Sequence, residues 1–203
     1  MHLFIWCSSI VKTTENRDYT SSLQATLHHI LYRGDMMETN IRHYAALLMQ
    51  SCDASAVISG SAAYPNIHGA VRFYRTRNGV LVAAEINGLP HSDGRCHHSI
   101  FAFHIHEGTM CEGDMHDPFS GAMSHYNPAD CEHPFHAGDL PPLFSNHGYA
   151  FTAFLTDRFS LSEIIGRTVI IHGNPDDFTT QPSGNAGEKL ACGVIIRCGR
   201  GCR

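Results

Sequence analysis

Short apolar runs separated by turn-forming residues fill the chain from Ala56 onward, and this pattern restricts the fold more than any other feature. The runs are rich in β-branched and aromatic residues and are bounded by Gly, Asn, Asp and Pro, which is typical of strands. The clearest pair, residues 70–76 and 80–86, is joined across Asn78-Gly79, a dipeptide that tolerates the positive φ of a tight hairpin turn. Eight such runs predict an all-β domain, an eight-stranded Greek-key sandwich or flattened barrel.

Residues 1–54 follow a different pattern. The stretches 23–27 and 41–49 have a helical period, and turn signals are few. We expect an N-terminal extension over 1–54 that is helical or poorly ordered. The alternative is upstream sequence ahead of a later start at Met36, Met37 or Met49. The β domain is then predicted to span 55–197, with a tail at 198–203.

Composition excludes two classes of function. No run of 18 apolar residues is present, so no membrane-spanning helix is expected. The formal net charge is -5 and the basic residues are scattered, which argues against a nucleic-acid surface. The apolar residues 3–7 make a poor export signal because no basic residue precedes them. The compartment stays open between cytoplasm, slightly favoured, and export.

Histidine is the residue type that points to chemistry, with 16 in the chain, most of them beyond residue 90. In the predicted strand 99–106, His104 and His106 point to the same face because strand side chains alternate. Together they could bind one metal ion, although an isolated pair of this kind is more often a solvated polar face. The next segment, 107–148, is a long loop, and loops of that length in a compact domain are usually functional.

Further candidate ligands follow in and after this loop. His125, His133, His136 and Asp139 lie in the loop, and His172 ends the predicted strand 168–171. Together with His104 and His106 they make six imidazoles and one carboxylate, too many for one tetrahedral ion. Two sites fit better, because zinc takes four N, O or S ligands and four imidazoles suit copper.

Four further segments stand out in the sequence: FHIHEG (103–108), SHYNP (124–128), HAGDL (136–140) and GNAGEKLACG (184–193). In this order they resemble the signatures of the copper,zinc superoxide dismutase family, and the resemblance runs from about Ser59 to Ile196. The resemblance implies the immunoglobulin-like sandwich architecture that this family shares. The stretches 107–111 and 139–143 are more similar to bacterial members than to animal or plant ones, which favours a bacterial source.

The resemblance also implies two metal sites that share His125. Copper would be held by four histidines and zinc by three histidines and an aspartate: His104, His106, His125 and His172 for copper; His125, His133, His136 and Asp139 for zinc. Asp176 matches the family's carboxylate that joins one copper histidine to one zinc histidine. Its alternative is a turn aspartate within residues 174–177.

The cysteines are assigned on the same basis. Cys111 and Cys192 match the family's intrasubunit disulfide, whereas buried free thiols are the alternative. Cys96 and Cys131 could form a second pair. We assign no role to Cys198 or Cys202.

The function that the resemblance implies is dismutation of superoxide to oxygen and hydrogen peroxide, with the copper histidines and Lys189 as catalytic residues. The partner would be the superoxide anion, and the protein a monomer or a homodimer. Lys189 stands where the family usually has arginine, and lysine keeps the charge without the rigid fork of donors. A solvated lysine is the alternative for that residue. The alternative function is a copper- and zinc-binding relative with little activity that delivers or stores metal.

Overall fold

The computed structural model describes residues 41–92 and 99–199, so expectations on residues 1–40, Cys96 and Cys202 lie outside it. The chain divides into two compact units, 1–45 and 46–203. In the first unit the described residues, 41–45, are helical, and so are residues 46–48 of the second. Nowhere in the described part does a helix reach the length and apolarity that crossing a membrane requires.

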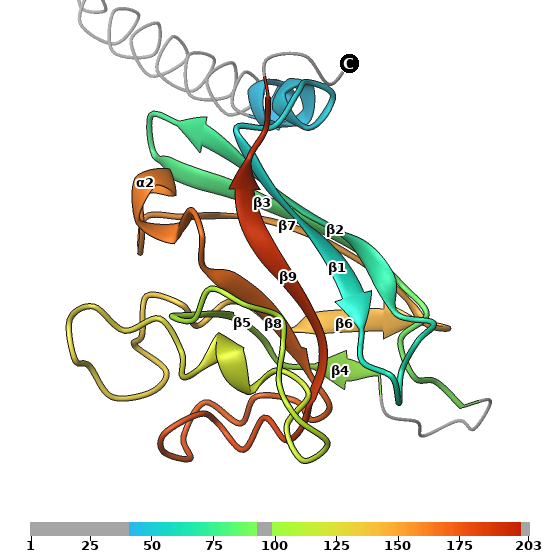
Figure 1. Cartoon of the computed structure of the whole chain (residues 1–203). Coiled ribbons are helices and arrows are strands. Elements are labelled where there is room, and N and C mark those ends of the chain that lie inside the picture. Colours follow the sequence, from blue (N-terminus) through green and yellow to red (C-terminus); the bar gives the residue numbers. More distant parts are fainter. Residues whose placement is uncertain (1–40, 93–98, 200–203) are drawn as a thin grey trace, which may run out of the picture. The chain divides into compact units, whose positions relative to one another are not determined.

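The second unit is an all-β domain, as the sequence predicts. Its strands form one antiparallel sheet in the order β4-β6-β7-β3-β2-β1-β9-β8-β5 (Figure 1). Their bounds are β1 Ala54–Gly60, β2 His68–Thr76, β3 Gly79–Asn87, β4 Ile100–Phe101, β5 Phe103–His106, β6 Leu143–Asn146, β7 Tyr149–Thr156, β8 Thr168–His172 and β9 Lys189–Arg197. Two short helical segments, η1 Ser120–Ala122 and α2 Leu161–Ile164, lie in the connections.

The described residues carry nine strands where eight were expected. Two expectations differ from the structure: β6 lies within the segment 107–148 that was expected to be a loop, and Ala102 interrupts the predicted strand 99–106. The Ala102 N–H donates to the Asn174 carbonyl at 2.8 Å, and its carbonyl accepts from the His172 N–H at 2.9 Å. β4 and β5 follow each other in the chain but lie at opposite ends of the sheet order. The sheet therefore curls into a nearly closed barrel.

The predicted hairpin is present as β2 and β3, which pair from His68↔Asn87 to Thr76↔Gly79. Gly79 has a φ of 121°, and a Cβ there would collide with the Thr156 carbonyl. The turn therefore requires glycine at this position.

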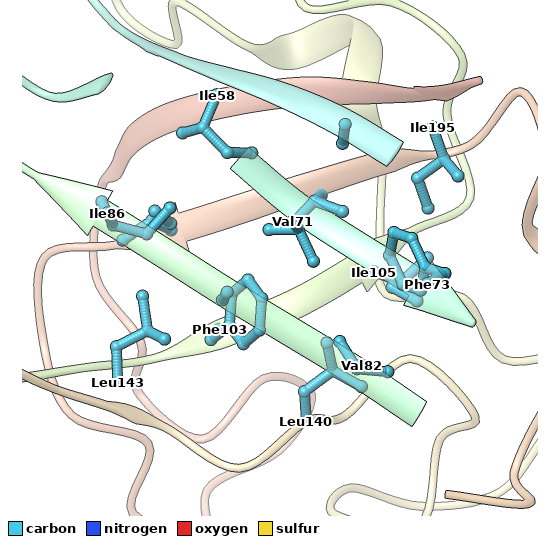
Figure 2. Close-up of a cluster of buried hydrophobic side chains, with 14 of the residues drawn as sticks. Ile58, Val71, Phe73, Val82, Ile86, Phe103, Ile105, Leu140, Leu143 and Ile195 are labelled. Carbon is cyan, nitrogen blue, oxygen red and sulfur yellow. The ribbon is translucent and has the colours of Figure 1, made fainter. Parts of the chain in front are cut away.

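The barrel interior is filled by apolar side chains from both halves of the sheet (Figure 2). Val71 and Phe73 of β2 lie on the same face of the sheet as Val82 and Ile86 of β3, and all four are fully buried. Phe103 of β5 also points into this core. Burying such a side chain contributes about 1.5–3 kcal/mol.

Candidate metal centre

Two groups of buried ligand atoms lie on the outer side of β5. In each group the candidate ligand atoms all lie within 4.8 Å of one another. Cluster 1 is His104, His106, His125 and His172, and cluster 2 is His125, His133, His136 and Asp139. The structure thus brings together every residue that the sequence singled out as a ligand, and His125 belongs to both clusters.

The strands place cluster 1. Phe103 and Ile105 face the core, so the alternating residues His104 and His106 face away from it. β8 pairs with β5 through Phe103↔Ile171, and His172 is the last residue of β8. Its ring centroid lies 5.0 Å from that of His104 and 5.3 Å from that of His106.

The long loop docks along β5 through its backbone and so supplies the other ligands. Isolated bridges join His106 to His125 and His104 to Asp139. The Tyr126 N–H donates to the Ile105 carbonyl at 2.8 Å. The loop is thus fixed to the strand on both sides of the shared ligand, His125.

In cluster 1 three rings are each held through one nitrogen by an acceptor outside the cluster. His104 Nε2 donates to Asp176 Oδ2 at 2.9 Å, and His106 Nδ1 to the Met123 carbonyl at 2.9 Å. His172 Nδ1 donates to the Gly187 carbonyl at 3.3 Å. The other nitrogen of each ring is left for the cluster, where His106 Nε2 and His172 Nε2 lie 3.1 Å apart.

Cluster 2 gathers three Nδ1 atoms around the carboxylate of Asp139. The distances from this carboxylate are 2.8 Å to His125, 3.0 Å to His133 and 3.3 Å to His136. The backbone N–H of His136 donates to Asp139 Oδ2 at 3.0 Å, which fixes the carboxylate in the loop. Burial by itself would raise the pKa of Asp139, but the bond from His125 and the nearby imidazoles lower it overall.

Asp176 joins the two clusters. Its Oδ2 accepts from His104 Nε2, and its Oδ1 accepts from His133 Nε2 at 2.8 Å. Burial alone would raise the pKa of Asp176. The bonds from His104, from the Phe178 N–H and from His133 outweigh burial and lower the pKa to about 2. The carboxylate is therefore ionised at neutral pH, and it keeps a proton on the outer nitrogen of both rings.

Burial favours the neutral form of the His106 and His172 rings. The pKa of His106 is well below its ordinary value because of burial and then the neighbouring His172. The pKa of His172 is likewise well below, through burial and then His104. A neutral imidazole has one lone pair free for a metal ion.

Three buried side-chain nitrogen atoms in the described residues have no hydrogen-bond partner, and all three belong to residues of the two clusters. They are His104 Nδ1, His125 Nε2 and His133 Nδ1. His133 Nδ1 is 3.0 Å from Asp139, but not in hydrogen-bonding geometry. Buried polar atoms without partners are costly and rare, and a cation in each cluster would satisfy all three. The donor sets, four imidazoles and three imidazoles with a carboxylate, suit copper and zinc respectively.

Lys189, at the start of β9, lines a cavity of about 470 Å³ together with His106, His125 and His172. Its Nζ donates to Asp117 Oδ2 at 2.6 Å and to the Phe119 carbonyl at 3.1 Å. The ammonium is therefore held beside cluster 1 and is not free in solvent.

Two disulfides occur among the described cysteines. Cys111–Cys192, with Cα atoms 5.6 Å apart, confirms the expected pair. Cys52–Cys198, with Cα atoms 6.1 Å apart, was not foreseen for Cys198. Cys131 is a free, exposed thiol, and its suggested partner Cys96 lies outside the described residues.

Arg158 was also missed by the sequence analysis. Its Nη1 donates to the backbone carbonyls of Pro134, His136 and Asp139 at 3.1, 3.3 and 3.1 Å. One guanidinium thus fixes the part of the loop that carries His136 and Asp139 of cluster 2. No pattern marks such a residue, because its partners are backbone atoms about twenty positions away.

Comparisons with known proteins agree with this geometry. Residues 67–195 match the model of the family "Copper/zinc superoxide dismutase (SODC)". A superoxide dismutase [Cu-Zn] from Aquifex aeolicus is 31% identical, over 74% of this chain and 94% of its own. One from Xenopus laevis is 34% identical, over 71% and 97%. The crystal structure of a double mutant of a SOD-like protein from Bacillus subtilis matches with a TM-score of 0.58 and 26% identity, over 70% of this chain and 96% of its own.

Proposed function

This chain belongs to the copper/zinc superoxide dismutase family, and on that premise we propose that it is an oxidoreductase that converts two superoxide anions and two protons into oxygen and hydrogen peroxide. The observation that carries the proposal is the pair of buried ligand clusters that share His125. A single structural zinc site would need only one of them.

We assign copper to cluster 1 and zinc to cluster 2, within a domain that spans residues 55–197. Copper would be held by His104 Nδ1 and by the Nε2 atoms of His106, His125 and His172. Zinc would be held by the Nδ1 atoms of His125, His133 and His136 and by the carboxylate of Asp139. This assignment uses the nitrogens that the outer partners of the rings leave available.

Copper held in cluster 1 would supply the one-electron chemistry, since it can accept an electron from one superoxide and return it to the next. His125 supplies the proton relay, because its Nδ1 lies in cluster 2 while its buried Nε2 faces cluster 1. When it does not hold copper, Nε2 can take up a proton from solvent and deliver it to the second superoxide, and the link of Nδ1 to cluster 2 keeps the ring oriented. Lys189 provides the positive charge that attracts the anion to this cavity.

The proposal is tested by reconstituting the purified protein with one copper and one zinc per chain and measuring superoxide consumption. We expect activity in the parent, loss of activity and of copper in His104→Ala, and no change in His116→Ala, which alters an exposed histidine outside both clusters. Lys189→Arg is expected to raise the rate, because a guanidinium docks an anion with two donors. Full metal loading with no superoxide consumption in the parent or in Lys189→Arg would contradict the proposal and favour a metal-storage or delivery protein.

A further inference from the structure

The ion pair between Lys189 and Asp117 joins residues 72 positions apart. The lysine side chain is only 15% exposed and that of Asp117 is 40% exposed. Lys189 Nζ has three N–H donors, and two of them are used by Asp117 and the Phe119 carbonyl. An anion in the cavity therefore meets an ammonium that already has a carboxylate partner.

Asp117 is held in place for this contact. Its Oδ1 accepts from the Phe119 N–H at 3.0 Å, which leaves Oδ2 for Lys189. Its own N–H donates to Asp114 Oδ1 at 3.0 Å. Phe119 is buried in a small apolar cluster with Cys192, against which Cys111 packs. The disulfide thus anchors the segment that carries the carboxylate.

The charges around the cavity make this contact important. Among the described residues that line the cavity, Lys189 is the one permanent cation, and Glu107 and Asp130 are anions. An ammonium 2.6 Å from a carboxylate acts at a distance as a dipole, whose field falls off faster than that of a single charge. The cavity therefore attracts anions less than the presence of Lys189 alone would suggest.

We propose that Asp117 sets the anion affinity of this cavity, because it holds the Lys189 ammonium in position and cancels most of its charge. Asp117 is a positioning residue that acts through Lys189, and the inference rests on the proposed function only in taking superoxide as the anion that the cavity serves. Asp117 moderates both the affinity for anions and its dependence on salt.

The test uses azide, a small anion, and the copper- and zinc-loaded protein. In Asp117→Asn the amide oxygen still accepts from the Phe119 N–H, but the charge is gone. We expect azide to bind about three- to tenfold more tightly, with a larger difference at low ionic strength. Binding is measured by optical titration of the copper absorption, so the result requires no turnover. An inactive parent would contradict the proposed function without touching this inference.

Two controls separate contact with Lys189 from a general change in charge. Asp114→Asn removes the same charge from the same loop without contacting Lys189, and we expect a smaller effect on azide affinity. In a Lys189→Gln background, Asp117→Asn should change azide affinity no more than Asp114→Asn does. Three outcomes would each overturn the proposal. Asp117→Asn and Asp114→Asn could change azide affinity equally in the parent, or Asp117→Asn could change it as much in the Lys189→Gln background as in the parent. The third is weaker azide binding in Asp117→Asn.

Discussion

Replacing Asp176 by asparagine exchanges one carboxylate oxygen, an acceptor, for an NH₂ group, a donor, at the point where the two clusters meet. Both carboxylate oxygens of Asp176 now accept, from His104 Nε2 and from His133 Nε2. An amide oxygen can accept from only one of these rings. The amide NH₂ then faces the other ring, whose Nε2 must lose its proton. The proton moves to Nδ1, the atom that points into the metal cluster, and that ring can no longer bind a metal ion.

The pKa of Asp176 gives a separate effect on stability. A fall in this pKa from 3.8 to about 2 means that the fold, net of the cost of burial, stabilises the ionised carboxyl by about 2.5 kcal/mol. Because the folded-state pKa is the lower one, this stabilisation is complete above pH about 4 and is lost as the pH falls through about 2. Losing it at neutral pH corresponds to about 60-fold in the folding equilibrium constant. For zinc, removing such an outer partner of a ligand ring costs roughly 10- to 100-fold in metal affinity.

The assay is zinc competition against a chromophoric chelator at neutral pH, with Asp177→Asn as the matched control. Asp177 is the next residue and is exposed, and the hydrogen bonds that the structure shows for its carboxylate go to Thr179 and Thr180. We expect Asp176→Asn to lose zinc affinity by about 10- to 100-fold and Asp177→Asn to keep it. Equal zinc affinities in the two variants would refute the reasoning that Asp176 fixes the ring tautomers.

Three further perturbations test the surroundings of the clusters. Arg158→Gln removes the guanidinium that holds three loop carbonyls and should lower zinc affinity about tenfold in the same competition assay. Unchanged zinc affinity would mean that the loop keeps its shape without this guanidinium. Gly184 has a φ of 65°, and Gly184→Ala places a methyl group against Asp176. This variant should also weaken zinc binding, whereas the control Ser183→Ala should not, and tight zinc binding by Gly184→Ala would contradict the crowding that the structure shows. Cys111→Ser should cost about 2–5 kcal/mol of unfolding free energy in denaturant titration, and a reductant that destabilises parent and variant equally would argue against this disulfide.

Local sequence patterns predicted those parts of the molecule that depend on neighbouring residues. Alternation in the segment 99–106 separated Phe103 and Ile105, which face the core, from His104 and His106, which face the clusters. The break at Ala102 was missed because its partners, including the His172 N–H, lie about seventy residues away.

The disulfide Cys52–Cys198 was missed for a related reason. The two cysteines flank β1 and β9, which pair from Ala54↔Arg197. The spacing of cysteines along the chain does not show that the first and last strands of a barrel are neighbours. Once that pairing is known, a bond between the residues just outside it is geometrically reasonable, because paired strands bring their ends within disulfide reach.

The choice of ring nitrogen is a harder problem, since it is decided by acceptors that no motif marks. His104 and His106 are two positions apart on one strand, yet His104 offers Nδ1 to the cluster and His106 offers Nε2. The difference comes from Asp176 in one case and from the Met123 carbonyl in the other. Met123 has a φ of 63°, which non-glycine residues rarely adopt, and contributes to the His106 ring only through its backbone. Sequence signatures can therefore predict which residues gather, whereas the orientation of each ring depends on contacts that only the folded chain creates.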